Sequence, residues 1–423
     1  MMRILAGNLL LACLITTHSF AASDNKRLPD PLSLSAALAI ANEQNPEIML
    51  AQAREQQAQA QRNAAQVSNN FQLRLDSSLG RREFNGHEEE NNTAYLVLQK
   101  QLYDFNRTNL TIAATEAQFA AQNALASLAQ NQYRQAVIDA YYAVLLADLT
   151  YRVENEQLAI EYVSLDNAKD EAKLGKFSAL ELLALEEPYQ RTIIRRALAE
   201  NAQRSTRAAL AELLGYPNAL PEELDIPDNS TLKKRALLDI NVLQKQALER
   251  NFELQAAAQL LTSYELKLQS AEQMSMPRID AIGRTGWHSH VDTLYEGRWR
   301  YDLTLTVPIM DGGLKASEVD KAKAELMRVR AQKLALERQV RQAVLETALQ
   351  LATLKSRAGQ IKVSGDYAEM ILDKNRTEYQ FERKADLGDS MVRATRVELE
   401  LMKLERDRAV LWENLQNLVG EAR

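Results

Sequence analysis

The stretch "VPIMDGGLKASEVDKAKAEL", residues 307–326, joins two patterns that belong to different secondary structures. Just before it, "RWRYDLTLTV" (298–307) alternates polar and apolar residues, which is typical of a β-strand with one apolar face. After Gly312 and Gly313 the sequence continues with charges of both signs, which favours an exposed helix. Pro308 cannot donate a ladder hydrogen bond, and glycine allows a sharp turn. The chain is therefore predicted to pass from a strand directly into a long polar helix.

Very long helices are indicated by the distribution of glycine and proline. The 423 residues contain only 9 prolines and 14 glycines, and these cluster. The segment from Asn106 to Leu174 contains neither, and a continuous helix of that length would reach roughly 100 Å. Val137, Tyr141 and Val144 recur at spacings of four and three, as in the seam of a coiled coil. One compact core cannot contain such a helix.

The chain is a tandem duplication. Asn45 and Asn251 belong to a set of matches 206 residues apart, and "RQAV" occurs at 134 and again at 341, 207 residues later. Asp104 and Asp311 share that second offset. Three prolines between the copies mark a connector. These matches predict a first repeat over 32–214 with a hairpin near 71–103, a connector over 215–236, and a second repeat over 237–423 with a hairpin near 277–308.

The hairpins allow two interpretations. In one, their apolar faces pack on the helices of a soluble protein. In the other, the apolar faces meet lipid and the polar faces line water, as in an outer-membrane barrel, whose strands need about 9 to 11 residues. Four strands cannot close a barrel, so the second interpretation requires several chains.

The start of the chain resembles a secretory leader over residues 1–21. Arg3 precedes an apolar run from Ile4 to Ile15, and small residues follow at "SFAAS". Cys13 is the only cysteine, so we expect no disulfide in the mature chain. "LLAC" also loosely resembles a lipoprotein processing site, and acylation of Cys13 stays open.

Composition and motifs give no support to an enzyme. The 51 basic and 57 acidic residues are mixed along the chain, which argues against a nucleic-acid-binding surface. His87, His288 and His290 are expected in outer loops, and no catalytic triad order, phosphate loop or His-x-x-x-His pair occurs. "HSH" at 288–290 could suggest export of a metal ion, but two surface histidines in a polar loop are more often incidental. We expect no catalytic residue, no metal and no cofactor.

The order of these segments resembles the TolC-like outer-membrane efflux channels over essentially the whole mature chain. "ALAIANEQNPEIMLAQA" (37–53) opens the first copy, and "VPIMDGG" (307–313) joins strand to helix in the second. The resemblance implies a homotrimer in which three chains supply four strands each to a twelve-stranded β-barrel in outer-membrane lipid, continued by an α-helical barrel in the periplasm. It implies a passive channel that works with a periplasmic adaptor and an inner-membrane efflux pump or ABC exporter. The alternative function is a periplasmic coiled-coil scaffold without a pore.

The resemblance also implies two functional places in each copy. The junction between strand and helix would be formed in the first copy by Asp104, and in the second by Pro308, Asp311, Gly312 and Gly313. The first copy lacks the proline and the glycines. The far turns would form a periplasmic tip that meets the adaptor and closes the resting channel. In the first copy "AKLGKFSALELL" (172–183) fits the family's tip, whereas "FERKADLGDSM" (381–391) departs from it. The tip candidates are Gly175, Ser178, Asp386, Gly388 and Asp389.

Overall fold

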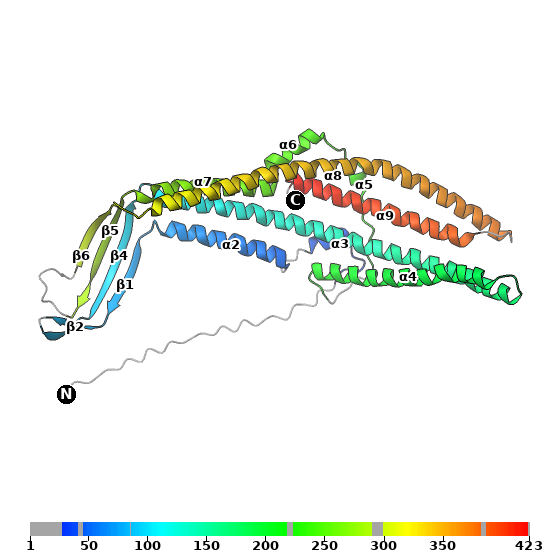
Figure 1. Ribbon diagram of the computed structural model, residues 1–423, viewed down its shortest axis with the longest axis horizontal. Helices are drawn as coiled ribbons and strands as arrows, with labels where there is room; N and C mark the ends of the chain where they lie inside the picture. Colours follow the sequence, from blue (N-terminus) through cyan, green and yellow to red (C-terminus); the bar gives the residue numbers. More distant parts are fainter. Residues whose placement is uncertain are drawn as a thin grey trace, which may run out of the picture.

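The computed structural model describes residues 28–40, 45–84, 86–217, 223–289, 299–381 and 386–421. The predicted leader with Cys13, His290, and Glu382, Arg383 and Lys384 of the second turn lie outside these residues. Long helices run side by side along a rod, and a small sheet lies at one end of it (Figure 1). Among the described residues, no helix has the length and apolar character needed to cross a membrane.

Both repeats follow the order of short helices, a hairpin and a pair of long helices, and the first repeat adds the small hairpin β2-β3. The first half consists of α1 (Leu34–Ala39), α2 (Pro46–Val67), β1 (Gln72–Ser78), β2 (Arg81–Phe84), β3 (His87–Glu90), β4 (Thr93–Tyr103), α3 (Arg107–Lys173) and α4 (Ala179–Leu213). The second consists of α5 (Ser230–Lys234), α6 (Ile240–Arg250), α7 (Phe252–Glu272), a 3-10 turn (Gln273–Ser275), β5 (Arg278–His288), β6 (Trp299–Thr306), α8 (Leu314–Gln380) and α9 (Leu387–Leu418). The Asn45 and Asn251 side chains cap α2 and α7 alike, by accepting hydrogen bonds from backbone N–H groups of the first turn.

The predicted long helix is confirmed, since α3 and α8 each contain 67 residues. At about 1.5 Å per residue each spans roughly 100 Å. The structure places α2 and α4 along successive parts of α3, while α7 and α9 lie against both long helices. The seam residues Val137, Tyr141 and Val144 are fully buried, and Val344 and Ala348 are buried at the matching positions of α8. The predicted seam therefore packs within one chain.

The connector crosses the rod near its middle and is held there by α3. Leu32 forms a parallel bridge with Leu224, and the Asp225 N–H donates to the Leu32 carbonyl at 3.0 Å. The Tyr141 hydroxyl lies 2.7 Å from both the Leu32 and Asp225 carbonyl oxygens. Burial raises the pKa of Tyr141 far above its ordinary value, so it remains a donor at physiological pH. The connection between the repeats is thus fastened to the core.

The two hairpins form one sheet rather than two. Its order is β1-β4-β5-β6, and every neighbouring pair is antiparallel. The pairing of β4 with β5 joins the repeats, and each of these strands contains 11 residues. His288 is the last residue of β5, so its expected place in a loop was wrong. His87 begins β3, in the small outer hairpin β2-β3, and is also a strand residue.

Candidate functional site

One face of the sheet is apolar and exposed. The register places Leu73, Leu98 and Tyr301 in one cross-strand row, and Leu75, Leu96 and Trp299 in the next. These side chains are between 43% and 78% exposed. Leu303 and Leu305 extend the same face at 73% and 62%. The interpretation in which the hairpins pack their apolar faces on the helices is therefore wrong, because none of the described helices covers these side chains.

The opposite face is polar. It carries three ion pairs of the same kind, each between an arginine and the aspartate two residues later on its own strand. They join Arg74 to Asp76 at 3.0 Å, Arg278 to Asp280 at 2.7 Å and Arg300 to Asp302 at 2.8 Å. Residues two apart on a strand share a face, so all six side chains point to the same side. Such a face is suited to line water, while the other is suited to lipid.

Both edges of the sheet lack a partner strand among the described residues. β1 and β6 each pair on one side only. Since every pairing is antiparallel, β1 and β6 run in opposite directions, so β6 of one copy can continue onto β1 of another as a further antiparallel pair. Unpaired edges template the addition of a strand from another chain.

The strand-to-helix junction of the second copy is a tight turn around Asp311. Gly312 and Gly313 have φ of 64° and 91°, in the left-handed region that glycine adopts without strain. The Asp311 carboxylate accepts hydrogen bonds from the backbone N–H of Gly313 and of Lys315, both at 3.0 Å. These backbone bonds hold the pKa of Asp311 below its ordinary value. Pro308 follows the end of β6 at Thr306.

The first copy forms the same turn without glycine. Phe105 and Asn106 occupy the matching positions with φ of 53° and 70°. The Asp104 carboxylate accepts from the Thr108 N–H at 2.7 Å and from its hydroxyl at 2.5 Å. A left-handed conformation costs a non-glycine residue roughly 1 to 2 kcal/mol. Sequence reasoning missed this turn because it looked for glycine, although the offset of 207 residues places Phe105 and Asn106 opposite Gly312 and Gly313.

The far turn of the first copy joins α3 to α4. Gly175 has φ of 75°, and its N–H donates to the Ala172 carbonyl at 2.9 Å. Ser178 caps α4, since its hydroxyl accepts from the Glu181 N–H, while the Glu181 carboxylate accepts from the Ser178 N–H at 2.7 Å. These bonds from Ser178 lower the pKa of Glu181. The cap therefore keeps its charged form in mild acid.

The second far turn has a different chemistry. Asp386 precedes α9 without forming a side-chain cap, and Asp389 lies in the first turn of that helix. Burial raises the pKa of Asp389, and a hydrogen bond and like charge from Asp386 raise it further. The two carboxyl groups therefore lie beside each other. Gly388 lies inside α9, where an added Cβ would come 2.8 Å from Cγ1 of Ile160 in α3, so its small size allows the two hairpins to meet.

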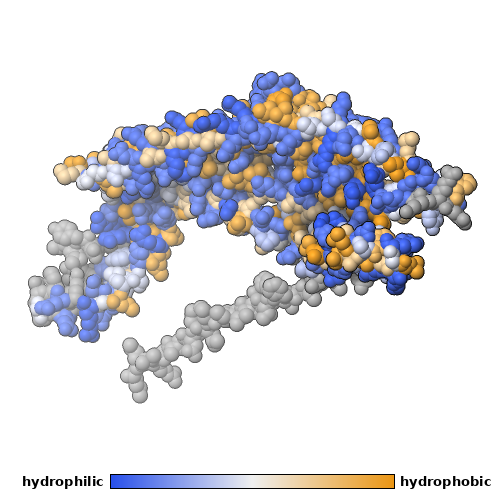
Figure 2. All heavy atoms as spheres, turned by 45° about the vertical axis from the view of Figure 1, so that its right-hand side comes forward, coloured by the Kyte–Doolittle hydropathy of each residue, from blue (hydrophilic) through white to orange (hydrophobic). Residues whose placement is uncertain are grey.

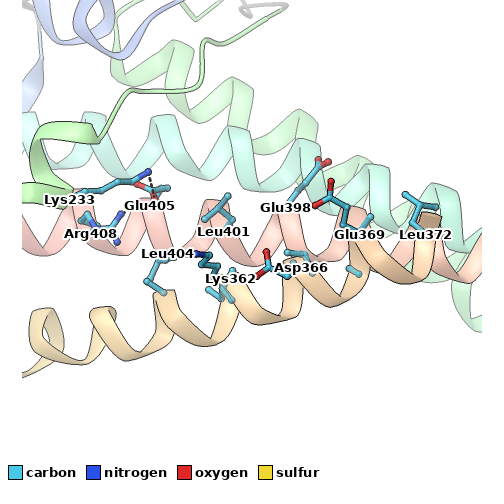
Figure 3. A pocket seen from close by; sticks show the side chains of 16 residues that line it. Lys233, Lys362, Asp366, Glu369, Leu372, Glu398, Leu401, Leu404, Glu405 and Arg408 are labelled. Carbon is cyan, nitrogen blue, oxygen red and sulfur yellow. Dashed lines mark hydrogen bonds and ion pairs between the residues drawn. The ribbon is translucent and has the colours of Figure 1, made fainter. Parts of the chain in front are cut away.

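A groove of about 590 Å³ runs between α8 and α9, and Lys233 of α5 reaches its rim (Figure 3). Lys233 forms an ion pair with Glu405 at 3.2 Å, and Arg408 binds the same carboxylate at 2.8 Å.

Apolar residues are also exposed along the helical rod, interspersed among polar ones (Figure 2). On α4 these include Leu180, Leu183, Ile194 and Leu198. Such surfaces are suited to helix contacts outside the chain.

Within the described residues, no group of three acidic, histidine or cysteine side chains is arranged to hold a metal ion.

Comparison with known families gives a match over the first half of the chain. The model described as "Outer membrane efflux protein" matches residues 37–216. Protein CyaE of Bordetella pertussis is 26% identical over 248 residues, which cover 57% of this chain and 52% of that relative. The chain thus aligns with about half the length of this curated relative.

Solved structures extend the likeness to nearly the whole chain. The outer membrane protein VceC of Vibrio cholerae matches with a TM-score of 0.74 and 16% identity, over 92% of this chain and 96% of that one. The Campylobacter jejuni CmeC outer membrane channel matches at 0.73 and 15%, over 92% and 85%. The open state of the Neisseria gonorrhoeae MtrE outer membrane channel matches at 0.72 and 17%, over 92% and 88%. The chain therefore has the fold of these outer-membrane proteins, with long helices and a small sheet in a duplicated chain.

Proposed function

We propose that this protein is an outer-membrane efflux or secretion channel, in which three copies close one twelve-stranded barrel around a water-filled pore. The four-stranded sheet carries the proposal, because it has an exposed apolar face, a charged opposite face and two unpaired edges of opposite direction. Strands of 11 residues are long enough to cross a bilayer when tilted. The similarity to CmeC and MtrE, which are outer membrane channels, supports the same function.

The helices would continue the barrel into the periplasm. The chain passes at Asp104 and Asp311 directly from strands into helices of roughly 100 Å, so the rod projects from the sheet end (Figure 1). The exposed apolar side chains of α4 would pack against neighbouring copies. Because the chain forms only a duct in this proposal, an inner-membrane pump or ABC exporter supplies the energy through a periplasmic adaptor, and no catalytic residue is required.

The two far turns would form the tip that closes the channel and meets the adaptor. Gly175 and Ser178 form a compact capped turn, whereas Asp386 and Asp389 bring two carboxyl groups together at the start of α9. Three copies would place three such pairs around the axis. We expect Asp386→Ala with Asp389→Ala to raise single-channel conductance without loss of the oligomer. An unchanged conductance in a correctly assembled double variant would remove these carboxylates from the gate.

Cysteine cross-linking tests the closure and the number of copies. Cys13 is the only natural cysteine, so replacing it leaves a clean background. One cysteine at Ser77 of β1 is combined in turn with single cysteines along β6 in cells. For β6 positions adjacent to Ser77 of a neighbouring copy, we expect covalent dimers and trimers and no larger product on a denaturing gel. A disulfide forms only where the Cα atoms lie within about 7 Å. Matched cysteines on the paired strands β4 and β5 should link only within one chain.

Absence of intermolecular products along all of β6, in protein that fractionates as soluble without detergent, would favour the scaffold function over the channel. A largest covalent product with another number of copies would refute the trimer but leave the barrel in place.

A further inference from the structure

The polar face of the sheet concentrates its arginines in one cross-strand row. Arg74 of β1 pairs with Val97, Val97 pairs with Arg284 of β5, and Arg284 pairs with Arg300 of β6. Three of the four strands therefore contribute an arginine at the same level. We call Arg74, Arg284 and Arg300 the arginine row.

Among the described residues, the neighbouring rows contain no arginine. The row on one side contains Asp76, Tyr95 and Gly286, and the row on the other contains Gln72, Gln99, Ile282 and Asp302. Each of these rows has one described carboxylate, against three guanidinium groups in the arginine row. Within the part of the sheet that the structure describes, the arginines are therefore concentrated in one row.

The ion pairs with aspartate leave two arginines of the row exposed. Arg74 and Arg300 bind their aspartates through Nε, and their side chains remain 51% and 57% exposed. Arg74 also donates from Nη1 to Gln99 Oε1 at 3.1 Å, which fixes its direction along the sheet. The guanidinium of Arg284 lies 5.4 Å from the centre of the Tyr95 ring. Arginine keeps its charge at all physiological pH values and offers several planar donors, which suit carboxylate and phosphate groups.

We propose that the arginine row is an anion-binding layer of the pore, which selects cargo carrying carboxylate or phosphate groups. This inference rests on the proposed trimeric channel, in which three arginines from each of three copies would form one ring of nine. Rings of basic side chains are a general device for passing anions through a pore, and low-dielectric walls strengthen their field. The layer lies in the sheet, remote from the acidic turn at Asp386 and Asp389, so it acts on cargo independently of the gate.

Block of the pore by inorganic tripolyphosphate tests the proposal. The purified full-length oligomer is placed in a planar bilayer in about 0.1 M KCl, where the screening length is about 10 Å. Tripolyphosphate is added to each side in turn. We expect stronger block from the sheet side, with a midpoint that rises at least ten-fold in the variant Arg74→Gln, Arg284→Gln, Arg300→Gln. The block of the wild type should weaken steeply with added salt.

Two further variants make the result specific. Asp76→Asn with Asp302→Asn retains all three arginines but removes the carboxylates that bind Arg74 and Arg300, so it should strengthen the block. This variant also provides a test if the triple variant does not assemble. Arg81→Gln is the matched control, because Arg81 is a well-exposed arginine of the outer hairpin outside the row, and it should leave the midpoint unchanged.

Conducting channels that show the same block with and without the arginines, or no block in the wild type, would overturn this inference and leave the proposed channel intact. Absence of any conductance from the assembled protein would overturn both.

Discussion

Replacing Leu303 by arginine tests which face of the sheet meets lipid in the proposed channel. Leu303 lies in the middle of β6, is 73% exposed within one chain, and pairs across the sheet with Ala281. An arginine that faces lipid at this depth should cost about 2 to 4 kcal/mol in each copy. If three copies assemble together, the total is about 6 to 12 kcal/mol, since the three sites are equivalent. Leu303→Arg should therefore nearly abolish the membrane-assembled oligomer.

The neighbouring residue provides the control. Thr304 points to the polar face and pairs with Asp280, whose carboxylate is bound by Arg278. Thr304→Arg places the same side chain one residue away, at an exposed position of the polar face, where a charge changes stability by only about 0 to 1 kcal/mol. Both variants are expressed equally, extracted from membranes, and compared by oligomer yield and by the urea concentration that dissociates the oligomer. Equal losses for the two variants, or a larger loss for Thr304→Arg, would refute the assignment of the faces.

Three other predictions concern the helices and turns. Val137→Asp buries an unpaired charge in the core and should lower the free energy of unfolding by about 3 kcal/mol or more, measured by urea denaturation. The control Ala159→Asp, on an exposed part of the same helix, should change the urea midpoint little. Gly313→Ala, at a φ of 91°, should destabilise the fold by about 1 kcal/mol. Gly359→Ala, in the interior of α8 with open space around it, should stabilise the fold by about 0.5 to 1 kcal/mol. The two variants should therefore shift the melting temperature in opposite directions. Because the pKa of Asp389 is raised, the folded chain prefers the protonated carboxyl group. The stability that the protonated group adds is therefore lost as the pH rises from the ordinary carboxyl pKa through the raised pKa. The protection factors for hydrogen exchange at the start of α9, which correct for the intrinsic rise of exchange with pH, should therefore fall over that range, and Asp389→Asn should remove this fall. An equal fall in the variant would contradict the assignment.

Much of the fold could be predicted because it follows from local patterns. The absence of glycine and proline from 106 to 174 predicts α3, and alternation in "RWRYDLTLTV" predicts β6. The offset between the repeats predicts that Asp104 and Asp311 have the same place, and both carboxylates do hold the first turn of a long helix. These features depend on periodicity and on short-range hydrogen bonds.

Other features depend on contacts between distant residues. The pairing of β4 with β5 is set by the packing of the two repeats, which no spacing in the sequence reveals. The size limit at Gly388 comes from Ile160 on another hairpin, and the arginine row requires the register of three pairings. The turn at Phe105 and Asn106 was hidden for a different reason: tertiary structure there holds residues in a conformation that their own preferences disfavour.

Conductance across a planar lipid bilayer tests the central claim most directly. The detergent-extracted oligomer, with no pump or adaptor, should insert and give discrete current steps that occur with wild-type protein and vanish with Leu303→Arg, which prevents assembly. The steps should become larger when Asp386 and Asp389 are both replaced by alanine. A correctly assembled, membrane-inserted oligomer that carries no current, with or without those two carboxylates, would contradict the account of this chain as a channel.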